Sequence, residues 1–314
     1  MNLCPKCAVE VIPGAKFCHR CGDKVVERNK NCPACHEQNP LSSVFCHHCG
    51  FHFDGKQAGK YHPRYEIDYK DADLSSQIRA LFFASLRQRV LEEHNIDRYS
   101  DYVERFYQSA FKEVYEVRSV QIARDAALRY DRFGDDGLPE IDERISTSFD
   151  GLLDYFIIQF CPDLHGFILP TSILKYEQAR PGKTNLREMF ADYLDLDREN
   201  ETVYTDFVSM HSGYLANACK NFLFAQRKEK VFFIVDLSLK GNCHDGFAMT
   251  DQAIYWKMPF DKARTVSYQN IHTIHREKDW LHINNLFFSA NAKLNLKMCK
   301  LLKKVKGKDW TTSG

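Results

Sequence analysis

The chain has 314 residues, of which 44% are hydrophobic and 27% charged, and its formal net charge is +1. This composition is that of an ordinary globular protein, and the length predicts two or three domains. The near-zero charge excludes a global electrostatic attraction to nucleic acid or acidic lipid. The longest apolar runs, around 152–160 and 231–237, are far too short to span a membrane.

Four Cys-x-x-Cys pairs occupy the N-terminal segment, and they contain Cys4, Cys7, Cys18, Cys21, Cys32, Cys35, Cys46 and Cys49. Ten residues separate the two pairs of each half, and the second half repeats the first after 28 residues. Two thiolate pairs on facing turns supply the four ligands of a tetrahedral zinc ion. The pattern therefore predicts two structural Zn²⁺ sites, one in each half.

Two alternatives remain open at these sites. Iron can be bound in the same cage, because sulfur ligands alone do not distinguish the two metals. The short spacing favours pairing in sequence order over a crosswise arrangement of Cys4/Cys7 with Cys32/Cys35. Four thiolates leave no coordination position for a substrate or an activated water, so we expect no catalysis at either metal.

Cysteine usage also indicates a compartment. The remaining cysteines (Cys161, Cys219, Cys243 and Cys299) are scattered without regular spacing, which together with the thiolate sites favours a reducing environment. Cys4 and Cys7 stand where the hydrophobic segment of a secretory signal would lie. We therefore expect a cytoplasmic protein.

Residues 1–53 resemble the double zinc ribbon found at the N-terminus of many bacterial proteins, and this resemblance implies a structural metal and a recognition role. The segment holds six Lys or Arg and four Asp or Glu. Two Zn²⁺ ions held by eight thiolates would turn that surplus into a charge of about −2. Phosphate binding needs a basic face, so we expect a protein partner. A local basic cluster keeps nucleic acid as an alternative partner: Lys16, Arg20, Lys24, Arg28 and Lys30.

A polar linker over 54–63 precedes a predicted helical domain over 64–229. Apolar residues three and four positions apart predict helices over 74–94, 98–131, 139–160, 184–196 and 200–227. Thr184 is the expected N-cap of the fourth helix. The acidic pairs Glu92/Glu93 and Asp135/Asp136 are expected to be solvated charges on a helix face or a turn.

The pattern changes near Lys230, where short runs rich in β-branched and aromatic residues begin. They predict strands over 231–239, 246–250, 253–257, 265–268, 281–283 and 286–289, followed by a helix over 291–305. A small α+β domain over 230–306 and a tail over 307–314 result. Gly246 to Trp256 resembles the start of bacterial PH-like and GRAM-like domains, in which an apolar strand ends in Thr-Asp or Thr-Asn before a second apolar strand. The predicted fold class is thus multidomain, with a metal-stabilised β ribbon, an all-α domain and an α+β PH-like domain.

The C-terminal helix carries a lysine stripe at positions i, i+4, i+7 and i+11, formed by Lys293, Lys297, Lys300 and Lys304. Such a stripe is a candidate interaction surface for anionic lipid, RNA or an acidic partner. The interpretation that we favour is a solvated face on a helix whose other face caps the sheet.

Sequence motifs of enzymes are missing from the chain. It has no His-Glu-x-x-His, no Gly-x-Ser-x-Gly and no Gly-x-Gly-x-x-Gly. Arg180 to Thr184 resembles the end of a phosphate-binding P-loop, but Glu177 occupies the position of the required glycine. We therefore expect no enzyme and no small-molecule substrate.

The leading hypothesis is a non-enzymatic zinc-binding adaptor or scaffold that mediates protein–protein interactions. The alternatives are a nucleic-acid- or ribosome-associated factor, a protein that binds anionic membrane surfaces through its PH-like domain, and an enzyme whose site lies in the helical domain or at its junction with the β domain. The whole arrangement is similar to uncharacterised bacterial zinc-ribbon proteins, a resemblance that implies no activity.

Overall fold

The computed structural model describes residues 67–310 apart from 72, 165, 167 and 168, together with 7, 9, 20, 21, 29–32, 38–40, 46 and 53. The chain divides into two compact units. Unit 1 comprises 1–87 and 97–141, and unit 2 comprises 88–96 and 142–314. Helices α1 (Leu74–Glu93) and α4 (Leu138–Phe160) each begin in unit 1 and end in unit 2. The domain boundaries expected from the sequence stay predictions.

A short antiparallel hairpin lies within the second half of the cysteine repeat. Strand β1 (Asn29–Asn31) pairs with β2 (Gln38–Pro40), with Asn29 opposite Pro40 and Asn31 opposite Gln38. The segment that joins the two strands begins with Cys32. A ribbon of this kind requires a cysteine turn between two short strands, so the hairpin agrees with the predicted ribbon. The predicted linker over 54–63 lies outside the described residues.

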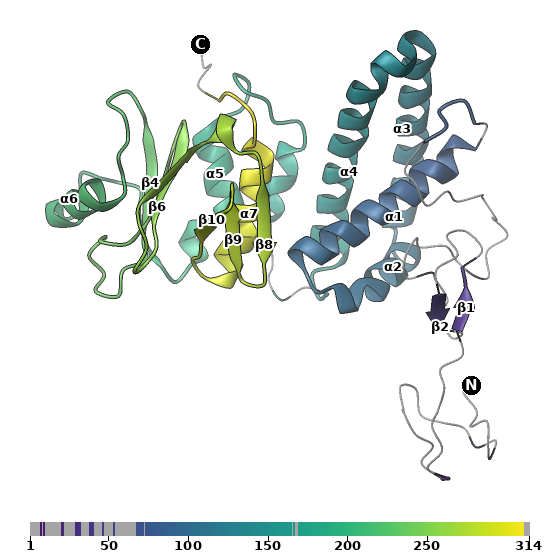
Figure 1. Cartoon of the computed structure of the whole chain (residues 1–314), viewed down its shortest axis with the longest axis horizontal. Helices are drawn as coiled ribbons and strands as arrows, with labels where there is room; N and C mark the ends of the chain where they lie inside the picture. The colour runs from purple at the N-terminus through teal and green to yellow at the C-terminus, as the bar shows by residue number, and fades with distance from the viewer. Residues whose placement is uncertain are drawn as a thin grey trace. The chain divides into compact units, whose positions relative to one another are not determined.

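The described helical part of unit 1 contains the start of α1, α2 (Tyr99–Gln108) and α3 (Phe111–Phe133), with a 3₁₀ turn at Gly134–Gly137 (Figure 1). A further 3₁₀ turn at Ile96–Arg98 begins at the last residue of the unit 2 segment 88–96. The single helix predicted over 98–131 is wrong, because Ser109 is extended, with φ −99° and ψ 162°. The Phe82 ring lies 5.8 Å from Phe106 and 6.1 Å from Phe111. Residues five apart in one continuous helix face different directions, so the break allows both rings to enter one core.

Helical segments of unit 2 include the end of α4, α5 (Leu186–Leu194) and α6 (Ser212–Asn221), with 3₁₀ turns at Thr171–Tyr176 and Leu196–Arg198. Asn185 rather than Thr184 caps α5, because its side chain accepts from the Glu188 amide, whereas Thr184 Oγ1 accepts from the Arg180 amide. The helix expected over 200–227 is confirmed only over Ser212–Asn221, which is α6, and is wrong at its start. Residues Thr202–Tyr204 form β3, whose β-branched Thr and Val pair with the following strand.

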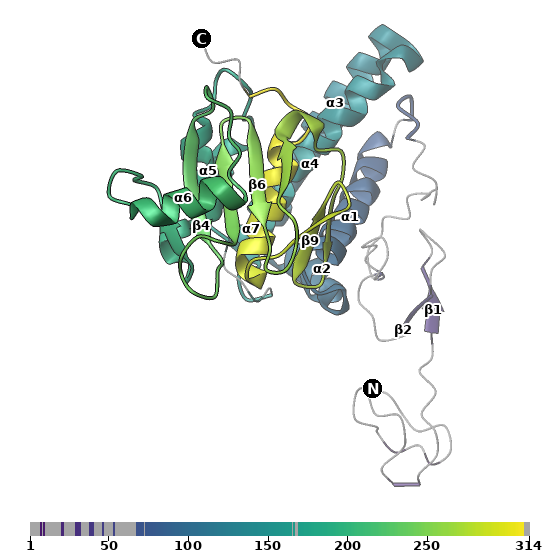
Figure 2. The same ribbon diagram turned by 60° about the vertical axis from the view of Figure 1, so that its left-hand side comes forward.

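Unit 2 contains a five-stranded antiparallel sheet in the order β3-β4-β5-β6-β7. The four strands after β3 are β4 (Val231–Asp236), β5 (Gly246–Thr250), β6 (Ala253–Lys257) and β7 (Arg264–Ser267). Alternate side chains enter opposite cores, as the two-residue period of a strand requires. One face packs in the core that contains α5 and α7, through Phe233, Val235, Phe247, Met249, Ile254 and Trp256. The other face packs against α6, through Ile234, Ala248, Ala253 and Tyr255 (Figure 2).

A second antiparallel sheet follows, in the order β10-β9-β8. Its strands are β8 (Ile274–Glu277), β9 (Trp280–Ile283) and β10 (Leu286–Phe288), with a 3₁₀ turn at Tyr268–Asn270 before them. The predicted C-terminal helix is confirmed as α7 (Ala292–Val305), which packs against this sheet and α5 (Figure 1). Strand β8 escaped prediction because three of its four residues, His275, Arg276 and Glu277, are polar or charged.

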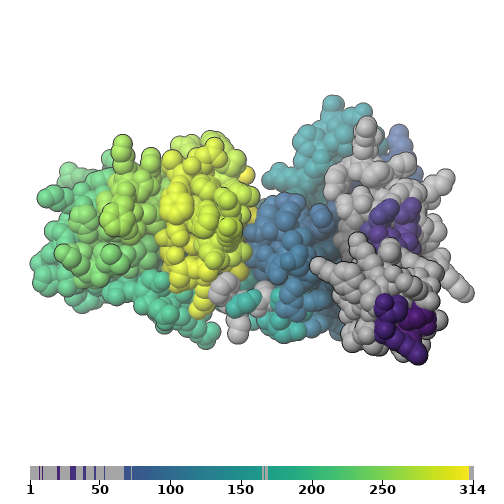
Figure 3. Space-filling model, turned by 60° about the horizontal axis from the view of Figure 1, so that its bottom comes forward, coloured from purple at the N-terminus to yellow at the C-terminus, as the bar shows by residue number. Residues whose placement is uncertain are grey.

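Two polar contacts hold this part of unit 2 together. Trp256 Nε1 of β6 donates to the carbonyl of Phe287 in β10 at 2.8 Å, which links the two sheets. Thr250 Oγ1 accepts from the amides of Gln252 and Ala253, each at 3.0 Å, and closes the turn between β5 and β6. In the space-filling view the green strands and the yellow C-terminal segment form one continuous surface (Figure 3).

Candidate functional site

Four of the eight predicted metal ligands lie among the described residues: Cys7, Cys21, Cys32 and Cys46. The other four, Cys4, Cys18, Cys35 and Cys49, lie outside them. Cys32 follows β1 directly, and Cys46 comes six residues after the end of β2. Both side chains are fully buried. The Asn39 side-chain amide donates to Cys46 Sγ at 3.4 Å.

These contacts fit a metal ligand. A neutral thiol is a weak acceptor, whereas a thiolate bound to a metal carries the charge that attracts an N–H donor. Cys32 and Cys46 would each supply one sulfur ligand, and Asn39 would orient the Cys46 sulfur. Among the described residues no group of three or more His, Cys, Asp or Glu side chains could hold a metal. Each predicted set of four cysteines has only two members in the described part of the chain, so neither set can be examined as a whole.

The lysine stripe of α7 is not a solvated face. Lys297 is only 1% exposed and Lys300 only 5% exposed. The interpretation of the stripe as a solvated helix face is therefore wrong for its two middle lysines. The long methylene stems lie along the apolar core while each ammonium reaches an internal acceptor. Lys297 Nζ donates to the Leu194 carbonyl at 2.7 Å and to Glu199 Oε1 at 2.6 Å. Whether any of the four lysines also binds an external partner stays a prediction.

The two ends of the stripe are also paired within unit 2. Lys293 Nζ lies 3.1 Å from Glu199 Oε1 and donates to the Arg198 carbonyl at 3.2 Å. Burial by itself would raise the pKa of Glu199, but the hydrogen bond from Lys297 lowers it below its ordinary value. Lys304 Nζ donates to the Glu177 carbonyl at 2.8 Å.

A network of charged side chains joins α7 to the last turns of α1 and to α4, all within unit 2. Its members are Arg89, Glu92, Glu93, Asp150, Asp154, Lys300 and Lys303. Lys300 Nζ lies 2.6 Å from Asp154 Oδ1 and 2.8 Å from Glu93 Oε2. Arg89 contacts both Asp150 and Asp154 at 2.6 Å through separate guanidinium nitrogens. Lys303 completes the network through Glu92 at 2.5 Å and Glu93 at 3.2 Å.

Glu93 lies at the centre of this charge network. Its side chain is fully buried, so the expectation of a solvated helix-face charge is wrong, whereas Asp135 and Asp136 are exposed as predicted. Burial by itself would raise the pKa of Glu93, but the charges of Arg89, Lys300 and Lys303 hold it well below its ordinary value. The carboxylate is therefore ionised in the core of unit 2.

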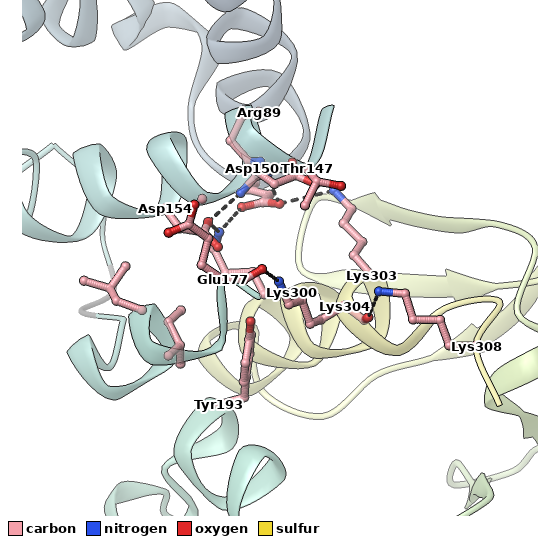
Figure 4. A pocket seen from close by; sticks show the side chains of 14 residues that line it. Arg89, Thr147, Asp150, Asp154, Glu177, Tyr193, Lys300, Lys303, Lys304 and Lys308 are labelled. Carbon is pink, nitrogen blue, oxygen red and sulfur yellow. Dashed lines mark hydrogen bonds and ion pairs between the residues drawn. The ribbon is translucent and has the colours of Figure 1, made fainter. Parts of the chain in front are cut away.

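A pocket of about 130 Å³ borders the network within unit 2. Network members form part of its charged lining, and Ile173 and Leu174 supply an apolar part. Tyr193 of α5 points its hydroxyl into the pocket toward the lysines of α7 (Figure 4). The remaining lining residues are Thr147, Gly151, Glu177, Lys304 and Lys308. Gly151 allows the close approach of Glu177, because a Cβ at that position would lie 2.5 Å from Glu177 Cγ.

Sequence reasoning missed most of this site, although a signal was present. Each of the three helices carries charged residues four apart: Arg89 and Glu93, Asp150 and Asp154, and Lys300 and Lys304. Such spacing places both members on one helix face. The signal could have indicated complementary charged faces, but it does not say which helices meet.

Two loops at one end of the five-stranded sheet expose large apolar side chains. The β4–β5 loop and the β6–β7 loop share this end, because Asp236 lies opposite Gly246 and Gly246 opposite Lys257. Leu239 of the first loop is 91% exposed and Phe260 of the second is 101% exposed. Phe260 has a φ of 65°, an unusual conformation for a bulky residue.

Comparison with known proteins assigns only the N-terminal segment. Residues 4–50 match the family model of the double zinc ribbon, a span that includes all eight predicted cysteine ligands. The N-terminal segment is thus a zinc-binding ribbon module. No curated protein and no solved structure matches the chain. In the part of the chain that the structure describes, no helix is both long and apolar enough to cross a membrane.

Proposed function

We propose that the protein is a non-enzymatic adaptor in which the ribbon, holding two structural Zn²⁺ ions, recognises a partner protein. The observation that carries this proposal is the double ribbon over 4–50. Two sets of four thiolates leave no coordination position for a substrate, so the metals stabilise the fold. A segment this small holds little core, and each ion would contribute on the order of 10 kcal/mol to its folding.

Unit 2 would serve as a second platform with a PH-like fold. This proposal is supported by the two antiparallel sheets and by the C-terminal helix α7, which shares one core with them and with α5. The Thr250–Asp251 turn between β5 and β6 supports it as well, since it occupies the position of the Thr-Asp element of the resembled family. Fold alone does not identify the ligand of such a platform.

Affinity capture from cell lysate with the full-length chain tests the adaptor function. The variant Cys32→Ser removes one zinc ligand, and Cys219→Ser is the matched control because Cys219 is an exposed cysteine of α6. We expect a nuclease-resistant protein partner that the control retains and Cys32→Ser loses. Release of the captured material by nuclease would instead support the nucleic-acid alternative. Equal capture by both variants contradicts recognition through the ribbon.

Membrane attachment is a second candidate function, favoured by the exposed loop tips at one end of the sheet. Leu239 and Phe260 present apolar side chains; the exposed Lys240 follows Leu239, and the exposed Lys262 lies two residues after Phe260. Apolar groups flanked by lysines suit the interface of an anionic bilayer.

Sedimentation with vesicles tests this second function. We expect recovery with vesicles that contain phosphatidylserine and not with pure phosphatidylcholine. Leu239→Asp together with Phe260→Asp should abolish it. Val208→Asp should not, because Val208 is 96% exposed but lies outside both loops. Recovery from both vesicle types, or equal loss with Val208→Asp, refutes membrane docking by these tips.

A further inference from the structure

The pocket beside the charge network contains two lysines that the network does not neutralise. The other three cations of the lining, Arg89, Lys300 and Lys303, each lie within an ion pair. Lys304 Nζ donates to the Glu177 carbonyl, and Lys308 Nζ lies 3.5 Å from the Lys304 carbonyl. In the described part of unit 2, neither ammonium forms an ion pair with a carboxylate. Each ammonium has three donors, so both have capacity to bind an added acceptor.

Tyr193 is the second observation that indicates a ligand. The residue is only 4% exposed, and its ring packs 6.0 Å from that of Tyr176. Tyr176 Oη donates to Asp192, whereas the Tyr193 hydroxyl has no hydrogen-bond partner among the described residues. It points into the pocket instead (Figure 4). The hydroxyl oxygen is not among the fully buried polar atoms that lack a partner, so it is open to the pocket and can donate to a bound acceptor.

The charges that line the pocket favour an anion. Arg89, Lys300, Lys303, Lys304 and Lys308 give five positive charges, and Glu93, Asp150, Asp154 and Glu177 give four negative charges. Glu92, which lies outside the lining, also pairs with Lys303, so the pocket and its ion-pair partners carry no net surplus. The positive charge open to an anion is that of Lys304 and Lys308, because the other three cations are paired. Burial also lowers the pKa of Lys304, and an anion beside its ammonium would reverse that effect.

We propose that this pocket binds a small phosphate ester, with the phosphate group held by Lys304, Lys308 and the Tyr193 hydroxyl. Lysine is a common phosphate ligand as a point charge, and the tyrosine adds a directed neutral donor. Asp150, whose side chain is 62% exposed, would accept from hydroxyl groups of the ligand on the opposite side. The volume of about 130 Å³ is close to the roughly 150 Å³ that holds benzene in another protein. A phosphate with a short polyol therefore fits.

Calorimetric titration of the full-length, zinc-loaded chain tests the proposal, with glycerol 3-phosphate, inorganic phosphate and glycerol as probes. We expect both phosphates to bind and glycerol not to bind. Lys304→Met removes a charged donor and should weaken binding by about 10-fold to 100-fold. Tyr193→Phe removes only the hydroxyl and keeps the ring, so it should weaken binding by about 3-fold to 10-fold without unfolding the pocket. Lys306→Met, an exposed lysine of the same helix end, should leave affinity unchanged.

Two further measurements distinguish the outcomes. Sedimentation with phosphatidylcholine vesicles with and without phosphatidic acid shows whether the phosphate comes from a soluble ester or a lipid headgroup. Acetylation of lysines, followed by mass spectrometry, should show protection of Lys304 when the phosphate is present. The proposal is overturned if neither soluble phosphates nor phosphatidic acid bind. It is also overturned if glycerol binds as tightly as its phosphate, or if Lys306→Met weakens binding as much as Lys304→Met.

Discussion

Replacing Lys300 with methionine tests whether the charge network stabilises unit 2. The Lys300 side chain is 3% exposed and lies 2.8 Å from Glu93 Oε2 and 2.6 Å from Asp154 Oδ1. At an effective dielectric constant of about 20, a pair of charges 2.8 Å apart attracts by roughly 6 kcal/mol before the cost of desolvation is subtracted. Removing one partner of a buried pair costs about 3–5 kcal/mol, because the other charge stays buried.

The expected loss for Lys300→Met lies at the lower end of that range, about 3 kcal/mol. Glu93 keeps Arg89 at 3.4 Å and Lys303 at 3.2 Å, so its charge is not left alone. Methionine also preserves most of the apolar packing of the lysine stem. With an m-value of about 2 kcal/mol per molar urea, the unfolding midpoint should fall by about 1.5 M.

Urea unfolding followed by tryptophan fluorescence measures this loss. The three tryptophans of the chain, Trp256, Trp280 and Trp310, all lie in unit 2, so the signal reports on that unit. Lys306→Met is the matched control, and its exposed position predicts a change within about 0.5 kcal/mol. If Lys300→Met shifts the midpoint no further than Lys306→Met, the argument from buried charge is refuted.

Three further predictions concern the ribbon, a tight strand contact and acid stability. Cys32→Ser should reduce the zinc content, measured by metal analysis, from two ions to one per chain. It should leave the urea midpoint followed by tryptophan fluorescence unchanged. An unchanged zinc content would contradict the predicted ligand set. Gly246→Ala should destabilise unit 2 by about 1–3 kcal/mol, because its Cβ would lie 2.2 Å from the Val235 carbonyl oxygen; an unaltered urea midpoint would be the contrary result. The pKa values of Glu93 and Asp154 in the folded protein lie below their ordinary values. The stability that these two carboxylates contribute is therefore fully present above about pH 4, near their unfolded pKa values, and is lost as the pH falls further. The melting temperature should therefore fall below about pH 4, and less steeply in Glu93→Gln; equal slopes would contradict this assignment.

Side-chain periodicity was sufficient for most elements of the C-terminal sheets. Strands β5 and β6 begin and end where the sequence predicts, because alternating residues such as Phe247 and Ala248 enter two different cores. The helices predicted over 74–94 and 139–160 agree with α1 and α4 within one residue at each end. A local pattern determines these elements, so a local analysis finds them.

Elements that depend on distant partners were missed. Strand β3 forms because Val203 pairs with Val235, which lies 32 residues away, and its own three residues carry no distinctive period. The break at Ser109 follows from the need of Phe106 and Phe111 to share one core with Phe82. The spacing of the apolar residues alone favoured one continuous helix, and tertiary packing overrode it.

The sequence by itself indicated the zinc ribbon over residues 4–50, because the spacing of Cys-x-x-Cys pairs places sulfur ligands on single turns without reference to the rest of the chain. Only the tertiary structure decided which charges are buried. Lys300 was indistinguishable from its neighbours in the lysine stripe, yet it pairs with Asp154, which is 146 residues away. The physical reason is that a lysine becomes an internal ion-pair partner only when a distant carboxylate is packed against it and water is excluded from both.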